Sequence, residues 1–130
     1  MKKKILIADD NAALQKQVEI YLRKQGYEVL VAVDGWECIA QLNKHNPDII
    51  LLDIEMPKMG GLYTLEVMAT YNITQRCPVI MLTGESHKEI VVRSLQLGAV
   101  DYLVKPFGLK DLMERITKHL SSNNKNRSIA

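Results

Sequence analysis

Hydrophobic positions follow two different periods along this chain. Short apolar runs, rich in Ile, Val and Leu, are separated by longer segments in which apolar residues recur every three or four positions. The first pattern is typical of buried strands, and the second is typical of helices with one buried face. The chain therefore predicts a βα unit repeated five times, with strands at Lys4–Ala8, Glu28–Ala32, Asp48–Leu52, Pro78–Leu82 and Val100–Val104.

The helical period is clearest in Ala12–Gln25, which Gly26 follows as a natural C-terminal stop. A second helix is predicted after Gly35, and the last one precedes the polar C-terminal segment. The apolar residues that give these periods are Leu14, Val18, Tyr21 and Leu22, then Trp36, Ile39 and Leu42, and finally Leu109, Leu112, Ile116 and Leu120.

A further helix is predicted at Ser86–Leu97. It carries more apolar residues than one inward stripe needs, so we expect some of them to face solvent or a partner. Val91 is the predicted exposed apolar contact.

The strand runs IILL and VIML contain no polar residue at alternate positions. Such runs are expected when helices cover both faces of a parallel sheet. Right-handed βαβ connections then predict an α/β fold with a doubly wound sheet. Ligands of such sheets bind beyond the carboxyl ends of the strands, where the strand order reverses.

The composition is that of one globular domain. With 130 residues and a formal charge of +2, the chain has no broad basic field for nucleic acid. Cys38 and Cys77 lie in no zinc-binding spacing, and no apolar stretch approaches the roughly 20 residues that span a bilayer. We expect a cytoplasmic protein with a folded domain at residues 1–121 and a polar tail or linker start at 122–130.

Polar side chains follow four of the predicted strands. They are Asp9 and Asp10 after the first, Asp53 after the third, Thr83 after the fourth and Lys105 after the last. The three carboxylates need a proton or a cation, and their oxygen atoms favour Mg²⁺, with Mn²⁺ as an alternative. A carboxylate can also form an aspartyl phosphate, whose oxygens a lysine and a hydroxyl would hold.

Each of these residues also has an ordinary structural interpretation. Asp9 and Asp10 could cap the first helix, Thr83 could belong to a turn, and Lys105 could be a solvated charge before a proline. The occurrence of all of them at strand ends of one topology favours a site over these alternatives.

Four stretches carry a family resemblance: ILIADDN, PDIILLDIEMPKMGG, PVIMLTGE and GAVDYLVKPF. Through them, essentially residues 3–120 resemble the receiver domains of bacterial two-component response regulators, including single-domain chemotaxis regulators. The resemblance implies a five-stranded parallel sheet of order 2-1-3-4-5, flanked by five helices, in the flavodoxin-like doubly wound arrangement.

The resemblance also implies roles for the acidic residues. Asp53 would accept a phosphoryl group from a histidine kinase or phosphotransfer protein. Asp10, Asp53 and the backbone carbonyl of Glu55 would bind Mg²⁺ directly, and Asp9 would act largely through water. Glu55 and Glu85 stand two places after Asp53 and Thr83, where the family varies, and are expected to tune the lifetime of the phosphoryl group.

Further implied roles concern the last strand. Thr83 and Lys105 would contact the phosphoryl oxygens, and the Lys105-Pro106 bond is a candidate for the cis form. Thr83 and Tyr102 would form a two-state pair that moves on phosphorylation. The output surface would be the fourth helix, the last strand and the last helix, engaging a target protein or an attached output domain.

Gly60-Gly61 departs from the family pattern, which more usually has an acidic residue before the glycine. The extra glycine could loosen the loop or permit a positive φ.

Two other functions compete with a signalling switch. A small phosphatase resembling the haloacid dehalogenase superfamily would place an acid two residues after its nucleophile, as Asp53-Ile54-Glu55 does loosely. Against it, the acid is Glu, the nucleophile follows the third strand, and no cap insertion is present. A flavodoxin is disfavoured because ADDN would repel the FMN phosphate.

We therefore expect a signalling switch that catalyses no reaction other than its own phosphorylation and dephosphorylation. It would be a monomer or a phosphorylation-dependent dimer, without nucleic acid or membrane contact of its own.

Overall fold

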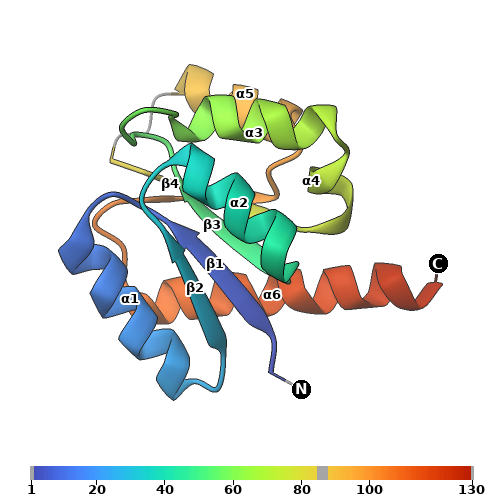
Figure 1. The fold of residues 1–130 in the computed structure, drawn as a ribbon. Helices are drawn as coiled ribbons and strands as arrows, with labels where there is room; N and C mark the ends of the chain where they lie inside the picture. Colours follow the sequence, from blue (N-terminus) through green and yellow to red (C-terminus); the bar gives the residue numbers. More distant parts are fainter. Residues whose placement is uncertain (1, 85–87, 130) are drawn as a thin grey trace.

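A computed structural model describes residues 2–84 and 88–129 of the chain, with side chains as far as residue 121. Within these residues, five strands alternate with six helices (Figure 1). The strands are β1 (Lys4–Ala8), β2 (Glu28–Ala32), β3 (Ile49–Asp53), β4 (Val79–Thr83) and β5 (Asp101–Val104). The helices are α1 (Ala12–Lys24), α2 (Gly35–His45), α3 (Gly61–Thr70), α4 (Ile73–Arg76), α5 (Lys88–Gln96) and α6 (Leu109–Ile129).

The strands form one parallel sheet in the order β2-β1-β3-β4-β5. From β1 the chain first runs to β2 on one side and then crosses back to β3 on the other, so the order reverses beside β1. A doubly wound sheet binds ligands at this reversal. The predicted fold class and strand order are confirmed.

Helices cover both faces of the sheet. In Figure 1, α1 and α6 lie on one face, and α2, α3, α4 and α5 lie on the other. Alternate residues of a strand point to opposite faces, so Ile5 and Ile7 of β1 pack toward α1 and α6, whereas Leu6 and Ala8 pack toward α2 and α3. All residues of β3 and β4 are buried, which explains their unbroken apolar runs.

The helix count differs from the prediction because a short helix, α4, separates α3 from β4. Asn72 adopts a left-handed conformation that ends the run of α3 and turns the chain, and Ile73 then enters the core. In α2, Cys38 and Leu42 form the buried face, whereas Trp36 is 65% exposed. Trp36 therefore shares the helix but not its inward stripe.

The predicted exposed contact on α5 is wrong by one position. Val91 is half-buried, whereas Val92 and Leu95 are 44% and 45% exposed. The helix turns Ser94 toward the core, where its hydroxyl donates to the Ile90 carbonyl oxygen at 2.8 Å. A serine whose hydroxyl bonds within its own helix can be buried at low cost, so the inward face of α5 accommodates Ser94 while Val92 and Leu95 face outward.

The C-terminal segment also differs from the expectation. The backbone continues as helix α6 to Ile129, beyond the end expected near residue 121, and it projects past the sheet in Figure 1. The division between a domain at 1–121 and a tail or linker at 122–130 stays a prediction.

Among the residues described, no helix is both long and apolar enough to cross a bilayer.

Candidate functional site

The predicted site residues lie at the carboxyl edge of the sheet. Asp53 and Thr83 are the last residues of β3 and β4, Asp9 directly follows β1, and Lys105 directly follows β5. Ala8 pairs with Leu52 in the register of β1 and β3, so Asp9 and Asp53 leave the sheet at the same level. The parallel topology therefore brings together side chains that are far apart in the sequence.

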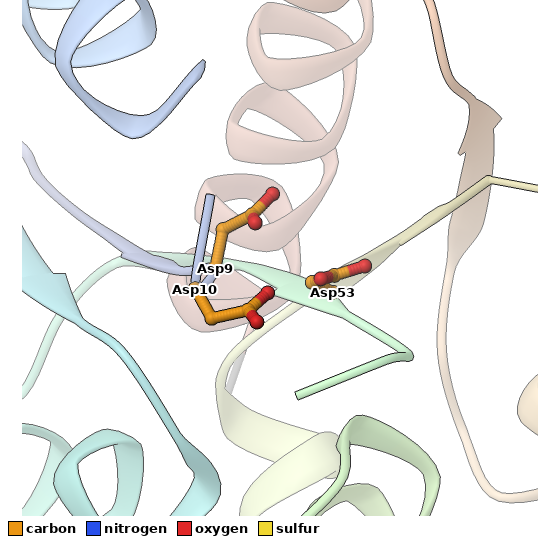
Figure 2. Close-up of side chains that lie close together, drawn as sticks. All are labelled: Asp9, Asp10 and Asp53. Atoms are coloured by element: carbon orange, nitrogen blue, oxygen red, sulfur yellow. The ribbon is translucent and has the colours of Figure 1, made fainter. Parts of the chain in front are cut away.

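The three aspartates form one cluster, which Figure 2 shows with the carboxyl groups gathered beside one another. One carboxylate oxygen from each of Asp9, Asp10 and Asp53 lies within 4.8 Å of the other two. Asp9 and Asp53 are buried, whereas Asp10 is exposed. Two negative charges about 4 Å apart repel by roughly 4 kcal/mol at an effective dielectric constant of 20, so the cluster requires a counter-charge.

The pKa of Asp53 reflects this environment. Burial, and after it the neighbouring Asp9 charge, raise the pKa from 3.8 to about 6, against the opposing effect of Lys105. At pH 7 the Asp53 carboxyl group is therefore mostly ionised, which is the state of a nucleophile.

Lys105 supplies one counter-charge. Its Nζ lies 2.8 Å from Asp9 Oδ2 and 3.3 Å from Asp53 Oδ1. Burial lowers the pKa of Lys105, but the nearby carboxylates of Asp9 and Asp53 outweigh burial and raise it. The ammonium is charged at neutral pH.

The Lys105-Pro106 peptide bond is cis, as predicted, and the Lys105 N–H donates to the Thr83 carbonyl oxygen at 2.7 Å.

The aspartates after β1 are not the helix cap. Asn11 caps α1, because its side-chain oxygen accepts from the Leu14 N–H at 3.1 Å. Asp9 Oδ1 instead accepts the Asn11 N–H at 2.9 Å, and this bond holds the Asp9 carboxylate toward Lys105. The capping interpretation of Asp9 and Asp10 is therefore wrong. Asn11, the third polar residue after β1, was the signal for the true cap.

An open cleft of about 800 Å³ gives access to this cluster. Asp10, Asp53 and Glu55 line it on one side, and Lys105 borders it as well. Asp9 does not line the cleft, and its Oδ2 makes no well-directed hydrogen bond within the described residues, leaving Lys105 as its charge partner. The clustered carboxylate oxygens fit a hard divalent cation such as Mg²⁺, and Asp10 and Asp53 are the two aspartates that line the cleft.

The glycine doublet after β3 has a steric role. A Cβ on Gly61 would collide with the backbone carbonyl of Asp53, whereas a Cβ on Gly60 would meet nothing closer than 3.4 Å. The Gly61 N–H also donates to the Ile54 carbonyl oxygen at 2.8 Å. Gly60 has a φ of −72°, and the left-handed residue of this loop is Lys58. The suggestion of a positive φ at the doublet is therefore wrong, and close approach to the backbone at the end of β3 is the reason for Gly61.

The remaining predicted residues occupy different surroundings. Thr83 is buried at the end of β4, one residue beyond the partner of Asp53 in the register. The Tyr102 side chain lies on β5 and is 38% exposed. Glu55 is exposed in the wall of the cleft, and Glu85 lies outside the described residues.

Comparison with known proteins identifies the family. Residues 5–117 match the model of the response regulator receiver domain. The chain is 34% identical over 123 residues to the DNA-binding response regulator MtrA of Mycobacterium tuberculosis, covering 95% of this chain and 53% of MtrA. It is 35% identical over 115 residues to the transcriptional regulatory protein PdtaR of the same species, covering 88% of this chain and 55% of PdtaR. The chain thus spans about half the length of these curated relatives.

Solved structures agree with the sequence match. A CheY-like receiver domain protein from Methanospirillum hungatei superposes with a TM-score of 0.91 at 33% identity, covering 97% of this chain and 99% of that one. Chemotaxis protein CheY4 of Vibrio cholerae superposes with a TM-score of 0.85 at 31% identity, covering 91% of this chain and 98% of that one. With its fold, its strand-end cluster and these relatives in agreement, the chain belongs to the response regulator receiver domain family of two-component signalling.

Proposed function

We propose that this receiver domain is a phosphorylation-activated switch whose phosphoacceptor is Asp53. The observation that carries the proposal is a buried but mostly ionised carboxylate, 3.3 Å from the Lys105 ammonium, at the wall of an open cleft. An Asp53 oxygen would bond to the phosphorus of a phosphohistidine while the P–N bond breaks and the departing imidazole takes up a proton. The donor would be a histidine kinase or a phosphotransfer protein.

The acidic residues around Asp53 would hold Mg²⁺. Asp10, Asp53 and Glu55 line the cleft. The two carboxylates and the backbone carbonyl of Glu55 would be direct ligands, whereas buried Asp9 would act through water and through Lys105. When bound, the cation neutralises charge on the phosphoryl oxygens. The Lys105 ammonium would align the acceptor and favour its ionised carboxylate, against the effects of burial and of Asp9.

Two further groups would contact the phosphoryl oxygens. The Lys105 ammonium already faces Asp53, and the hydroxyl group of Thr83 stands at the end of the next strand. Charge-assisted hydrogen bonds from such groups stabilise a phosphoryl group as its charge develops. Glu55, exposed in the cleft wall, would influence how water reaches the acyl phosphate. The same role for Glu85 remains a prediction.

The signal would leave through the α5-β5-α6 surface. Thr83 would turn toward the phosphoryl group and Tyr102 would move inward, as one two-state pair. The outward position of the Tyr102 ring is consistent with the unphosphorylated member of that pair. Around it, this surface exposes apolar side chains that a partner could cover: Val92, Leu95, Val100 and Val104.

The partner on the output side would be a target protein or an attached output domain in the cytoplasm. The relatives named as DNA-binding or transcriptional regulators support an output of that kind in those proteins. This domain would itself contact no nucleic acid. It would act on no substrate other than its own acyl phosphate, so phosphate monoesters should not be turned over.

A labelling experiment tests the assignment. Incubation with acetyl phosphate and Mg²⁺, read by intact mass, should add one phosphoryl group to the wild type and none to Asp53→Asn. Asp48→Asn is the matched control, because Asp48 precedes β3 (Ile49–Asp53) at the opposite end of the strand. Labelling that persists in Asp53→Asn would overturn the proposal, and repeated turnover of phosphate monoesters would identify a phosphatase instead.

A further inference from the structure

Asp101, the first residue of β5, anchors a polar cluster on the opposite side of this strand from β4. Its Oδ1 accepts the Tyr102 N–H at 2.8 Å and Arg115 Nη1 at 2.8 Å. Its Oδ2 lies 3.0 Å from Nε2 of His119. Arg115 and His119 are one turn apart on α6, so the cluster joins the strand to that helix. We call Asp101, Arg115 and His119 the β5–α6 latch.

Arg115 makes two further contacts. Its Nη1 donates to the Tyr102 carbonyl oxygen at 2.9 Å, and its Nε donates to Asp111 Oδ1 at 3.2 Å. Both backbone polar groups of Tyr102 are therefore bonded by latch side chains. In the described sheet β5 is an edge strand, so the carboxylate and the guanidinium take the place of a neighbouring strand at this residue.

The latch is partly shielded from water. The side chains of Asp101, His119 and Arg115 are 18%, 12% and 34% exposed. Burial raises the pKa of Asp101, but the hydrogen bonds from His119 and the Tyr102 N–H, with the Arg115 charge, outweigh it and lower the pKa. Charge-assisted bonds of this kind are stronger than those of fully exposed pairs.

The other end of the same strand enters the acidic site. Lys105 follows β5 and places its ammonium on Asp9 and Asp53, while its N–H bonds the Thr83 carbonyl oxygen. Only two residues of extended chain separate Lys105 from Tyr102. A displacement of Lys105 toward a phosphoryl group would therefore be passed through these two residues to the Tyr102 peptide groups that the latch holds.

We infer that the β5–α6 latch is a positioning element, which ties the Tyr102 backbone to α6 and transmits the state of the acidic site to that helix. The inference rests on the proposed function, because it takes phosphorylation of Asp53 as the event transmitted. Arg115 is the central member, since its planar guanidinium reaches Asp101, Asp111 and the Tyr102 carbonyl at once. A lysine at this position keeps the charge but offers no such fork.

The test compares Arg115→Lys with a control on the other edge of the sheet. Arg23 of α1 has the same arrangement, because its Nε bonds Glu19 four residues earlier and its Nη2 donates to the Val29 carbonyl oxygen of edge strand β2. Arg23→Lys therefore removes an equivalent fork that has no connection to Lys105. Isotope-labelled wild type and both variants are treated with Mg²⁺ and beryllofluoride, a stable mimic of aspartyl phosphate, and the amide shifts of α6 are followed by NMR.

In the wild type and in Arg23→Lys, the α6 amides should shift on addition of the mimic. In Arg115→Lys, labelling of Asp53 by acetyl phosphate should stay within about twofold of wild type, while the α6 response falls at least about threefold. Asp101→Asn, which keeps the size of the side chain and removes its charge, should weaken the response in the same direction and serves if Arg115→Lys folds poorly.

The outcomes separate the two proposals. If the wild type takes no phosphoryl group on Asp53, the proposed function is overturned, and so is the inference that the β5–α6 latch transmits phosphorylation. If Asp53 is labelled and the α6 response of Arg115→Lys equals that of wild type, only the latch is overturned. A loss of response equal in Arg23→Lys and Arg115→Lys would also overturn it, since any edge arginine would then have the same effect.

Discussion

Replacement of Asp53 by asparagine should stabilise the metal-free protein. The substitution keeps the shape of the side chain and removes the charge that burial and Asp9 make unfavourable. The pKa of Asp53 lies at about 6 in the folded protein and at 3.8 as the reference value for an unperturbed group. One pKa unit corresponds to about 1.4 kcal/mol, so ionisation of Asp53 costs the folded state about 3 kcal/mol at high pH.

The sign follows from proton linkage. The folded state binds the Asp53 proton more tightly than the unfolded chain, so this group lowers the free energy of unfolding as pH rises from about 4 to about 6. Above that window the cost is constant. Asp53→Asn should therefore exceed wild type in stability by about 3 kcal/mol at pH 8 and by about half of that at pH 5.

Urea unfolding in the presence of EDTA, followed by circular dichroism at pH 8 and pH 5, measures the difference. With a slope of about 1–3 kcal/mol per molar urea, the midpoint of Asp53→Asn should rise by roughly 1 M or more at pH 8. Asp48→Asn should show no comparable pH-dependent gain. A variant no more stable than wild type at pH 8, or a difference independent of pH, would refute the account of the buried carboxylate.

Three other predictions concern neighbouring parts of the site. Mg²⁺ at about 100 times its dissociation constant should stabilise wild type by about 2.7 kcal/mol, and an equal shift of the melting temperature in Asp10→Ala would contradict the ligand assignment. Lys105→Met should lower the free energy of unfolding by about 2 kcal/mol or more in urea, because Asp9 then remains buried without a counter-charge; unchanged stability would disprove this role. Gly61→Ala should destabilise the fold by about 1–3 kcal/mol through collision with the carbonyl of the last β3 residue, whereas Gly60→Ala should cost less, and equal losses in thermal melts would argue against the steric explanation.

Features that depend on local periodicity were predictable from the sequence. The apolar runs of β3 and β4 identified central strands because a parallel sheet covered on both faces requires apolar residues on both sides. The polar residues at the strand ends followed from the same reasoning, since parallel strands present their carboxyl ends at one edge. Motif resemblance supplied the strand order and the cis bond before Pro106, and the structure agrees with both.

Features that depend on partners distant in the sequence were missed or wrongly assigned. Asn11, the residue directly before α1, caps that helix, whereas the Asp9 carboxylate lies beside Lys105, which is distant in the sequence. The packing of α5 against the sheet places Ser94 inward, and Val92 rather than Val91 is exposed.

The sequence by itself determined that this protein is an α/β domain with acidic, hydroxyl and ammonium groups at one edge of a parallel sheet, because the hydrophobic pattern and the alternation of strands and helices can be read along the chain. Only the tertiary structure decided which carboxylates lie beside Lys105 and why position 61 requires a glycine. It also decided that Arg115 donates a hydrogen bond to the backbone of edge strand β5. Those relations depend on distances between segments that a one-dimensional pattern does not contain, since they arise when helices pack at a particular rotation and depth against the sheet.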